Sequence, residues 1–452
     1  MRRNGESLVR NPKPLAEFII RRLREAGHEA ILAGGCVRDL LLGRPPKDYD
    51  VATSATPEEV RRLFPKSLAV GAAFGVVIVL EGASQVEVAT FRREDSYSDG
   101  RRPDHVTFTE AREDALRRDF TINGMFMDPL SGEVVDYVGG RADLAARVIR
   151  AIGEPRTRFA EDHLRMLRAV RFAAELDFAI EPATAEAIRE LADKMARTSG
   201  ERVAEELKRL LTAPPPGRRR GLELAAQLGL LAVLLPEVQA MRGVAQSETV
   251  PLPGDLLDHT IRCVENLREP TPELAFGALL HDVGKPRTAM LRDGRQTFYG
   301  HERVGEGLAA DVCERLHLST AQRERIARLV RSHMKLMMAD EMREARLKRL
   351  MADDAFEELA ELWRADCLAS GGTAEPYEAL MARYRAMGRE IVRPPPLVSG
   401  NDLIDLGLDP GPIFREILDE VYDAQLEGRA ASKDEAMALA KKIAAERCPK
   451  KS

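Results

Sequence analysis

Two aspartates stand two residues apart in "KDYDVAT", at Asp48 and Asp50. Because residues i and i+2 of a strand face the same side, a strand here would present the two carboxylates about 7 Å apart on one face. Oxygen ligands of this kind suit Mg²⁺, and a pair of such ions can hold triphosphate oxygens while activating a hydroxyl for in-line attack. The alternative is an Asp-x-Asp on an exposed strand or turn that has no chemical role.

A glycine pair precedes the aspartates in "AILAGGCVRDLLLG". Gly34 and Gly35 follow an apolar run and open a helical pattern, so their backbone could approach a phosphate at a helix N-terminus. Farther along, Glu87 lies between Val86 and Val88, and in a strand it would point away from both valines. Glycine turn, paired aspartates and a candidate third carboxylate together outline a nucleotide site, although each motif alone also occurs in ordinary loops and exposed strands.

Four of the eight histidines lie in settings that suggest metal binding: His259 in "LLDHTI", His281 in "LLHDVGKP", His301 in "YGHERVG" and His333 in "RSHMK". Imidazole with a carboxylate such as Asp282 suits a transition metal that keeps open positions for water. The alternative is a helical domain that retains these histidines only for packing.

The elements that must carry these residues change in character after about residue 140. Residues 28–140 mix helical stretches with short β-branched runs, and "GVVIVLEGASQVEVATF" predicts a hairpin, so we expect a small α/β domain. From Arg147 onward apolar residues recur every three or four positions, which predicts helices. Proline clusters at 212–220 and 393–400 predict linkers, because proline runs cannot continue a helix.

Length and composition restrict the class of protein. A chain of 452 residues with 44% hydrophobic residues predicts two to four domains with real cores. No run of eighteen apolar residues and no signal-peptide pattern is present, so we expect a cytoplasmic protein without a membrane partner. Five cysteines without a CxxC pair argue against a disulfide framework or a thiolate zinc site. The oligomeric state stays open, a homodimer included.

The formal net charge of −5 is not that of a typical nucleic-acid-binding protein, but a global sum can hide a local basic stripe. The segment "RVIRAIGEPRTRFAEDHLRMLRAVRF" is rich in arginine and could form such a surface for RNA. The basic "PPPGRRRG" is expected to be a solvated linker, with a contact to a phosphate as the alternative.

Residues 28 to about 180 resemble the class II tRNA nucleotidyltransferase and bacterial poly(A) polymerase family of the polymerase β superfamily. The motifs stand in the family's order: "LAGGCVRDLLLGRPPKDYDVAT", "EVATFR", "YSDGRRPDHVTF", "RRDFTIN", "DPLSGEVVDYVGGRADL" and "EDHLRMLRAVRFA". The resemblance implies that Asp48 and Asp50 hold catalytic Mg²⁺, with Glu87 as third carboxylate. It also implies contacts to the triphosphate and ribose from Gly34, Gly35, Arg38, Arg118, Asp119 and Asn123.

Asp162 and Arg165 in "EDHLRMLR" would share a helix face at a spacing of three. Cytosine and adenine both present an amino group beside an acceptor ring nitrogen, whereas uracil and guanine present a carbonyl beside a ring N–H. A carboxylate that accepts and a guanidinium that donates therefore match C and A. The resemblance implies this template role, with Glu161 as a supporting neighbour and Arg168 in the nucleotide-binding set; an ordinary salt bridge is the alternative.

The run "HDVGK" after "FGALL" resembles the HD superfamily of metal-dependent phosphohydrolases. The resemblance implies a core ligand set of His259, His281, Asp282 and Asp366. His301 and His333 match the extra ligands of two-metal members. Phosphatase or 2′,3′-cyclic phosphodiesterase activity would follow.

These patterns predict an α/β nucleotidyltransferase head with a small mixed sheet, an all-α neck, an HD domain and a helical tail. The predicted domains are 1–145, 146–215, 216–392 and 393–452. The tail resembles the segment with which bacterial class II enzymes embrace tRNA. The expected activity is addition of C and/or A from CTP and ATP to the tRNA 3′ end, with Mg²⁺ in the head and one or two divalent transition-metal ions in the HD domain.

Other activities stay open: addition of only A or only CC, poly(A) synthesis, phosphohydrolysis by an HD domain beside a non-catalytic head, and RNA binding without catalysis. The loop "REDSYSDGRRPDHVTF", which the family uses in switching from C to A, favours an enzyme able to add A. Intact Asp48 and Asp50 argue against a non-catalytic head.

Overall fold

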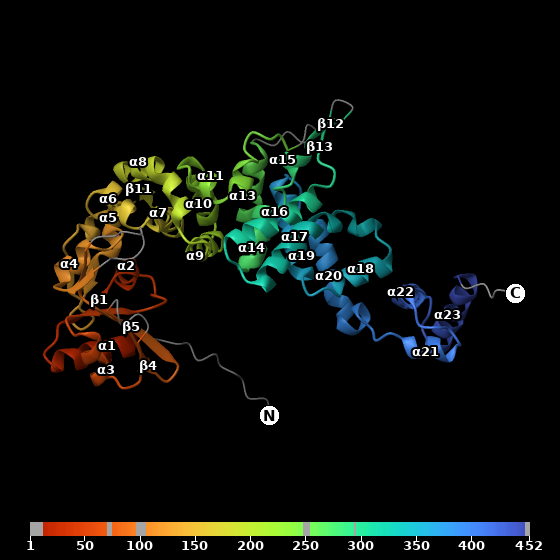
Figure 1. Cartoon of the computed structure of the whole chain (residues 1–452), viewed down its shortest axis with the longest axis horizontal. Coiled ribbons are helices and arrows are strands. Elements are labelled where there is room, and N and C mark those ends of the chain that lie inside the picture. Colours follow the sequence, from red (N-terminus) through yellow and green to blue (C-terminus); the bar gives the residue numbers. More distant parts are fainter. Residues whose placement is uncertain (1–11, 70–74, 96–104, 247–253, 293–294, 448–452) are drawn as a thin grey trace. The chain divides into compact units, whose positions relative to one another are not determined.

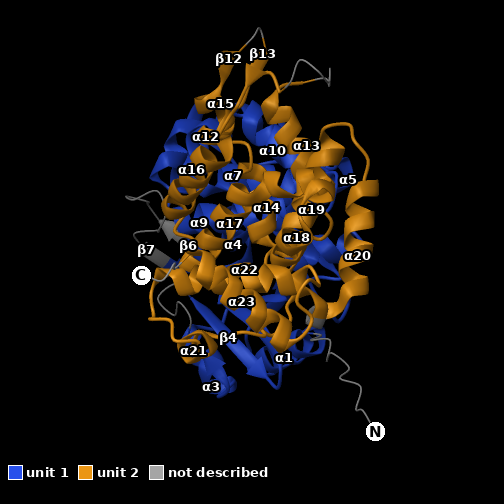
Figure 2. Ribbon diagram, turned by 90° about the vertical axis from the view of Figure 1, so that its right-hand side faces the viewer, with its two compact units in different colours: residues 1–236 blue, residues 237–452 orange. Residues whose placement is uncertain are grey.

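The computed structural model describes residues 12–69, 75–95, 105–246, 254–292 and 295–447. The chain divides into two compact units, residues 1–236 and 237–452 (Figure 2). Within the described ranges no helix is both long and apolar enough to cross a membrane.

A seven-stranded mixed sheet forms the base of the first unit (Figure 1). Strands β2 and β5 run parallel and the other neighbours are antiparallel, with β4 and β5 forming the predicted hairpin. In sheet order the strands are β3 (Ser67–Leu68), β4 (Val76–Glu81), β5 (Ser84–Thr90), β2 (Asp50–Thr53), β1 (Ala30–Ala33), β8 (Met125–Met127) and β9 (Val134–Asp136). The predicted mixed sheet is confirmed.

Short helices and small strand pairs accompany this sheet. Apolar residues of α1 recur at helical spacing, and this face is buried beside β1 and β2. The elements are α1 (Lys13–Glu25), α2 (Gly35–Leu41), α3 (Pro57–Leu63), β6 (Arg92–Asp95), β7 (His105–Phe108), α4 (Ala111–Leu116), the 3₁₀ turn η2 (Thr121–Asn123), α5 (Gly140–Ala146), β10 (Val148–Ile149) and β11 (Ala179–Ile180).

The rest of the first unit is helical, as predicted. Helix α7 is buried along nearly its whole length, because α9 and α10 pack against it. The elements are α6 (Pro155–Glu161), α7 (Leu164–Leu176), α8 (Pro182–Leu191), η3 (Ala192–Arg197), α9 (Gly200–Leu211), α10 (Gly217–Gln227) and α11 (Leu230–Leu234). Helix α12 (Pro236–Gln239) begins at the last residue of this unit.

The proline cluster at 212–220 does not link two compact units, although the prolines at 214–216 are exposed. It makes a tight turn between α9 and α10, and Arg218 is buried in the first turn of α10. A Cβ on Gly217 would lie 2.6 Å from the carbonyl oxygen of Ala174, so α10 starts in direct contact with α7. The boundary between the two compact units falls later, after Pro236.

The second unit is a helical bundle with one small hairpin. Helix α14 is apolar on all sides, and α13, α17 and α19 surround it. The elements are α13 (Leu256–Asn266), α14 (Pro272–Leu280), α15 (Lys285–Thr288), β12 (Met290–Arg292), β13 (Arg295–Thr297), α16 (His301–Arg315), α17 (Thr320–Ser332), η4 (His333–Glu341), α18 (Glu344–Met351), α19 (Phe356–Ala369) and α20 (Glu375–Val392). The β12–β13 hairpin differs from the purely helical expectation.

The last helices share a hydrophobic core of their own. Residues between Val398 and Ala444 pack together in it, among them Leu403, Ile417 and Val421. The helices are α21 (Gly400–Asp405), α22 (Pro412–Leu426) and α23 (Lys433–Arg447). The predicted fold class is confirmed, while the division into four domains is finer than the two compact units and stays a prediction.

Candidate active site and metal centre

A hollow of about 930 Å³ in the first unit is lined by nearly all the nucleotide-site residues predicted from the sequence. The lining includes Gly34, Gly35, Arg38, Asp48, Asp50, Arg118, Asp119, Asn123, Asp162, Arg165 and Arg168. Glu87 is not part of the lining. Sheet strands, the turn η2 and the helices α7 and α9 therefore converge on one site.

The three predicted carboxylates lie at one place in the sheet. The predicted placement of both aspartates on one strand is wrong, because strand β2 begins at Asp50 and Asp48 lies in a bend before it. Glu87 is the register partner of Asp50 across the parallel β2–β5 pair. It is exposed while Val86 and Val88 are buried, as its position between the valines predicts.

The electrostatics of this carboxylate group favour a cation. Burial, followed by the Glu87 carboxylate, raises the pKa of Asp50 to about 6. None of the three carboxylates is in an ion pair with a described side chain. A divalent cation would supply the missing positive charge, so the donor set fits Mg²⁺.

The glycine turn between β1 and α2 brings backbone close to a guanidinium. Gly34 has a φ of 76°, which favours glycine, and Arg118 Nη1 would lie 2.8 Å from a Cβ at this position. Arg118 is held in place by two hydrogen bonds to Asp114 Oδ2, of 3.1 Å from Nε and 2.9 Å from Nη2.

Four predicted residues form one chain of hydrogen bonds. Arg38 Nη1 donates to Asn123 Oδ1 at 2.8 Å, and Asn123 Nδ2 donates to Asp119 Oδ1 at 3.1 Å. Arg168 donates to Asp119 Oδ2 from Nε at 2.9 Å and from Nη2 at 2.7 Å. Burial alone would raise the pKa of Asp119, but the Arg168 guanidinium lowers it to about 2. Asp119 is therefore a fixed anion that links the turn η2 to α7.

The expected single helix through "EDHLRMLR" is wrong. Helix α6 ends at Glu161, Asp162 is extended with a φ of −146°, and α7 starts at Leu164. Asp162 and Arg165 both line the hollow, and the backbone N–H of Arg165 donates to the carbonyl oxygen of Asp162 at 3.1 Å. The Arg165 side chain donates from Nη1 to Glu161 Oε2 at 2.7 Å, which gives Glu161 the supporting position expected of it.

Two residues of α9 in this site were missed from the sequence. Arg202 donates two hydrogen bonds to Asp162, and buried Glu206 accepts one from Arg168 Nη1 at 3.3 Å. They stand four residues apart in "GERVAEELKRLL", a spacing that gives them one helix face. That pattern is common on exposed helices, so it gave no signal of a site. The loop proposed to favour A addition falls largely on residues 96–104, outside the described residues.

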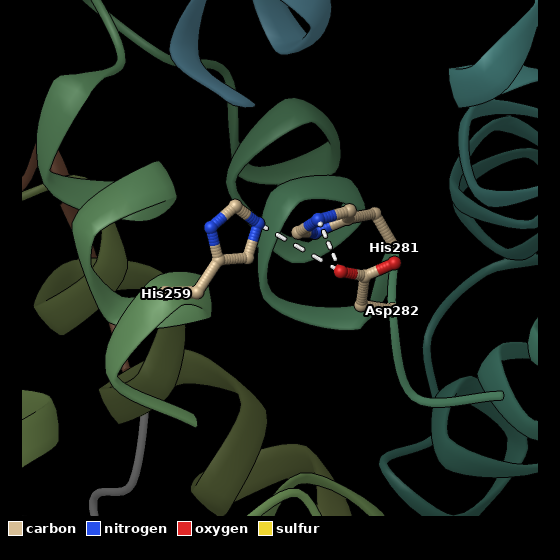
Figure 3. A group of neighbouring side chains, drawn as sticks. All are labelled: His259, His281 and Asp282. Carbon is tan, nitrogen blue, oxygen red and sulfur yellow. Dashed lines mark ion pairs between the residues drawn. The ribbon is translucent and has the colours of Figure 1, made fainter. Parts of the chain in front are cut away.

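The predicted metal ligands converge in the second unit. They come from α13, the end of α14, the start of α16, the start of η4 and α19: His259, His281, Asp282, His301, His333 and Asp366. Figure 3 shows the first three of them, with the Asp282 carboxylate facing both imidazoles.

Asp282 lies at the centre of the set. Its Oδ2 is 3.7 Å from His259 Nε2 and 3.2 Å from His281 Nε2. Its Oδ1 is 3.3 Å from His301 Nε2 and 3.8 Å from His333 Nε2. Each oxygen of this carboxylate thus faces one pair of imidazoles. The second acid, Asp366, lies beside the first pair, with its Oδ1 3.0 Å from His259 Nε2.

The orientation of the imidazoles fits metal binding. The Nδ1 atoms of His281, His301 and His333 lie 2.7, 2.9 and 2.7 Å from backbone carbonyl oxygens. When Nδ1 donates its proton to a carbonyl, the lone pair of Nε2 points to the centre. His281 Nε2 and Asp282 Oδ1 are buried without a hydrogen-bond partner. A divalent metal would satisfy them, whereas packing alone would leave them unpaired.

Three protein-family models match parts of the chain. The Poly A polymerase head domain matches residues 30–150, the probable RNA and SrmB-binding site of polymerase A matches 177–241, and the HD domain matches 256–366. The head and HD families both imply dependence on divalent metal ions. The motif-based resemblance to these families is thereby confirmed.

Curated relatives match the chain over part of their length. The CCA-adding enzyme of Geobacillus stearothermophilus is 47% identical over 217 residues, 48% of this chain and 53% of that protein. The CCA-adding enzyme of Lactobacillus johnsonii is 43% identical over 226 residues, 50% of this chain and 55% of that protein. The matched region is about half the length of these relatives.

Solved structures match almost the whole chain. The Bacillus stearothermophilus CCA-adding enzyme in complex with CTP is 30% identical, covers 96% of this chain and 98% of its own, and has a TM-score of 0.73. The Thermotoga maritima CCA-adding enzyme complexed with tRNA is 22% identical with a TM-score of 0.60, covering 97% of each chain, and shows the fold alone. With 30% identity over nearly the full length of both chains, the chain belongs to the CCA-adding enzyme family.

Proposed function

We propose that the protein adds C and A residues from CTP and ATP to the 3′ end of tRNA without a nucleic-acid template. The observation that carries this proposal is that one hollow is lined both by Asp48 and Asp50 and by the base-reading candidates Asp162 and Arg165. Relatives named CCA-adding enzymes support it, one of them solved with CTP. Because tRNA is the substrate, we place the protein in the cytoplasm.

The catalytic role falls to Asp48, Asp50 and Glu87, which would hold Mg²⁺. When bound, Mg²⁺ supplies Lewis-acid stabilisation for the attacking 3′-oxygen and the leaving pyrophosphate. The chain's own cations at the site, Arg38 and Arg118, are fixed by hydrogen bonds and offer preorganised charge to the triphosphate.

Selection of the base falls to Asp162 and Arg165. The carboxylate of Asp162 accepts from the exocyclic amino group of C or A, and the guanidinium of Arg165 donates to the neighbouring ring nitrogen. U and G offer a carbonyl to the carboxylate and a ring N–H to the guanidinium, so both contacts become repulsive. Both side chains line the same hollow as Asp50.

A second activity, metal-dependent phosphohydrolysis, is favoured by the HD centre. Two groups of ligands share Asp282: His259 and His281 on one side, His301 and His333 on the other. We propose that they hold two divalent transition-metal ions, with Asp366 completing the first group. Phosphatase or cyclic phosphodiesterase activity at damaged RNA ends is the reaction class that this centre supports.

The test is extension of three tRNA transcripts, ending before CCA, after CC and after CCA, with each NTP alone and with CTP plus ATP. The proposal predicts that CTP plus ATP restores CCA on the shortest transcript, with UTP and GTP inert. Addition of A only to the transcript ending in CC would show an A-adding enzyme, and long A tails a poly(A) polymerase. The absence of any extension would contradict the proposed head activity and leave the HD centre as the working site.

A further inference from the structure

Helix α9 holds the base-reading carboxylate from outside the motif that contains it. Arg202 Nη1 donates to Asp162 Oδ1 at 3.1 Å, and Arg202 Nη2 donates to Asp162 Oδ2 at 2.8 Å. The side chains are 28% and 15% exposed, so the pair is largely shielded from water. A two-pronged pair of this kind fixes the plane of the carboxylate as well as its position.

The hydrogen bonds to Asp162 leave few acceptor sites for a ligand. An ionised carboxylate offers about four lone pairs, two on each oxygen. Oδ1 accepts from Arg202 Nη1 and also from the backbone N–H of Leu164 at 3.1 Å. Among the described residues Oδ2 accepts only from Arg202 Nη2. One acceptor site therefore remains, on Oδ2.

The next turn of α9 supports the same site. Glu206 is 5% exposed and accepts from Arg168 Nη1 at 3.3 Å and from Arg171 Nε. Arg168 in turn holds Asp119. Since Arg202 and Glu206 share one face of α9, the helix anchors both Asp162 and the Asp119–Arg168 pair.

We propose that Arg202 is a positioning residue that sets the base specificity of Asp162, an inference that rests on the proposed function. By occupying one lone pair on each oxygen and fixing the carboxylate plane, Arg202 leaves one directed acceptor for one exocyclic amino group. Without it the carboxylate rotates and presents either oxygen to water or to a mismatched base, so that discrimination against U and G falls.

The first test compares Arg202→Gln and Arg202→Lys with the full-length protein. For single-nucleotide addition to tRNA, kcat/KM for CTP relative to UTP should fall about ten- to hundredfold in Arg202→Gln, the usual effect of losing hydrogen bonds to a charged group. Arg202→Lys keeps the charge but not the planar fork, so it should lose discrimination as well. The KM for tRNA should not change.

The matched control is Lys208→Gln on the same helix. Lys208 is paired with Glu205 at 2.7 Å and does not line the hollow, so this variant removes one charge and one ion pair from α9 without touching Asp162. Its discrimination and its unfolding temperature should equal those of the unsubstituted protein. Unfolding curves of all variants show whether a loss reflects misfolding.

A double-mutant cycle with Asp162→Asn decides whether Arg202 acts through Asp162. If it does, Arg202→Gln lowers discrimination little further once Asp162 is changed. Independent, multiplicative effects of the two substitutions, or unchanged discrimination in folded Arg202→Gln, would overturn the inference. Failure of the unsubstituted protein to add C or A would instead overturn the proposed function.

Discussion

Gly34 leaves no room for a side chain at the nucleotide site. Its φ of 76° favours glycine, and Arg118 Nη1 occupies the space where a Cβ would stand. Gly43, after α2, has a similar φ of 68° but nothing within 4 Å of its Cβ position. Both positions have a positive φ, but Gly34 also has a ψ of −133°, a combination that few residues other than glycine adopt, and Arg118 adds a clash there.

We predict that Gly34→Ala destabilises the fold by about 1–3 kcal/mol and displaces Arg118, raising KM for CTP about tenfold or more. Gly43→Ala, the control, should show the strain in urea unfolding with an unchanged KM. Equal KM values for CTP in the two variants would show that the close packing of Arg118 on Gly34 does not affect nucleotide binding.

The Asp119–Arg168 pair predicts a pH dependence of stability. The pKa of Asp119 is about 2 in the fold, below that of the unfolded chain, so its charge stabilises the fold above about pH 4 and this contribution disappears as the pH falls toward 2. In urea unfolding at pH 7, the free energy of unfolding of Asp119→Asn should be about 2 kcal/mol lower than that of the unsubstituted protein. This difference in the free energy of unfolding between the two proteins should stay constant from pH 7 to 5 and shrink below pH 4.

The control for this pair is Asp193→Asn, which removes an exposed ion pair with Lys194 and should leave the unfolding free energy unchanged. A deficit of Asp119→Asn that grows on acidification would contradict the assignment of Asp119 as a buried anion.

At the scale of elements, the break between α6 and α7 is what separates Asp162 from Arg165. The Asp162 carboxylate accepts from the Leu164 N–H, a local bond that competes with helix continuation. Apolar periodicity continues through the break, so the sequence pattern predicted one helix with both side chains on the same face. The structure instead gives each side chain a different partner.

The candidate site residues could be predicted because they stand in short local motifs. Contacts between residues far apart in the sequence could not be predicted. Asp48, Asp50 and the histidines could be found because residue type and spacing specify their chemistry. Arg202 lies 40 residues from its partner Asp162, and no pattern in one sequence pairs them. The β12–β13 hairpin is only three residues per strand, too short for alternation to distinguish it from a loop.

The start of α15 and the start of α16 touch through Gly284 of "HDVGK". A Cβ on Gly284 would overlap the carbonyl oxygen of His301, whereas Gly307 in the middle of α16 has open space around its Cβ position. We predict that Gly284→Ala shifts His301 and lowers the bound metal measured by elemental analysis to about half or less. Gly307→Ala should keep full metal content and gain up to about 1 kcal/mol of stability. Full metal content in Gly284→Ala would contradict this close approach.

At the scale of the whole molecule, the two candidate sites lie in different compact units. The carboxylate site lies in residues 1–236 and the histidine centre in residues 237–452. The described residues of each candidate site come from one unit, so we expect that substitutions at one site do not alter the chemistry at the other.

We predict that His281→Ala abolishes metal-dependent hydrolysis of a phosphate ester and lowers metal content, while kcat and KM for C addition stay within about twofold, as expected for distant, independent sites. The reciprocal variant, Asp50→Asn, should keep the metal content of the histidine centre. Loss of C addition in a folded His281→Ala protein would show that the two centres are coupled.

The most direct measurement is the product formed on a tRNA that ends just before CCA, sequenced after incubation with Mg²⁺ and all four NTPs. We predict that the unsubstituted protein adds CCA and stops, and that Asp50→Asn forms product at least about a hundredfold more slowly. A product containing U or G, or undiminished extension by Asp50→Asn, would contradict the claim that this one hollow both selects the nucleotide and transfers it.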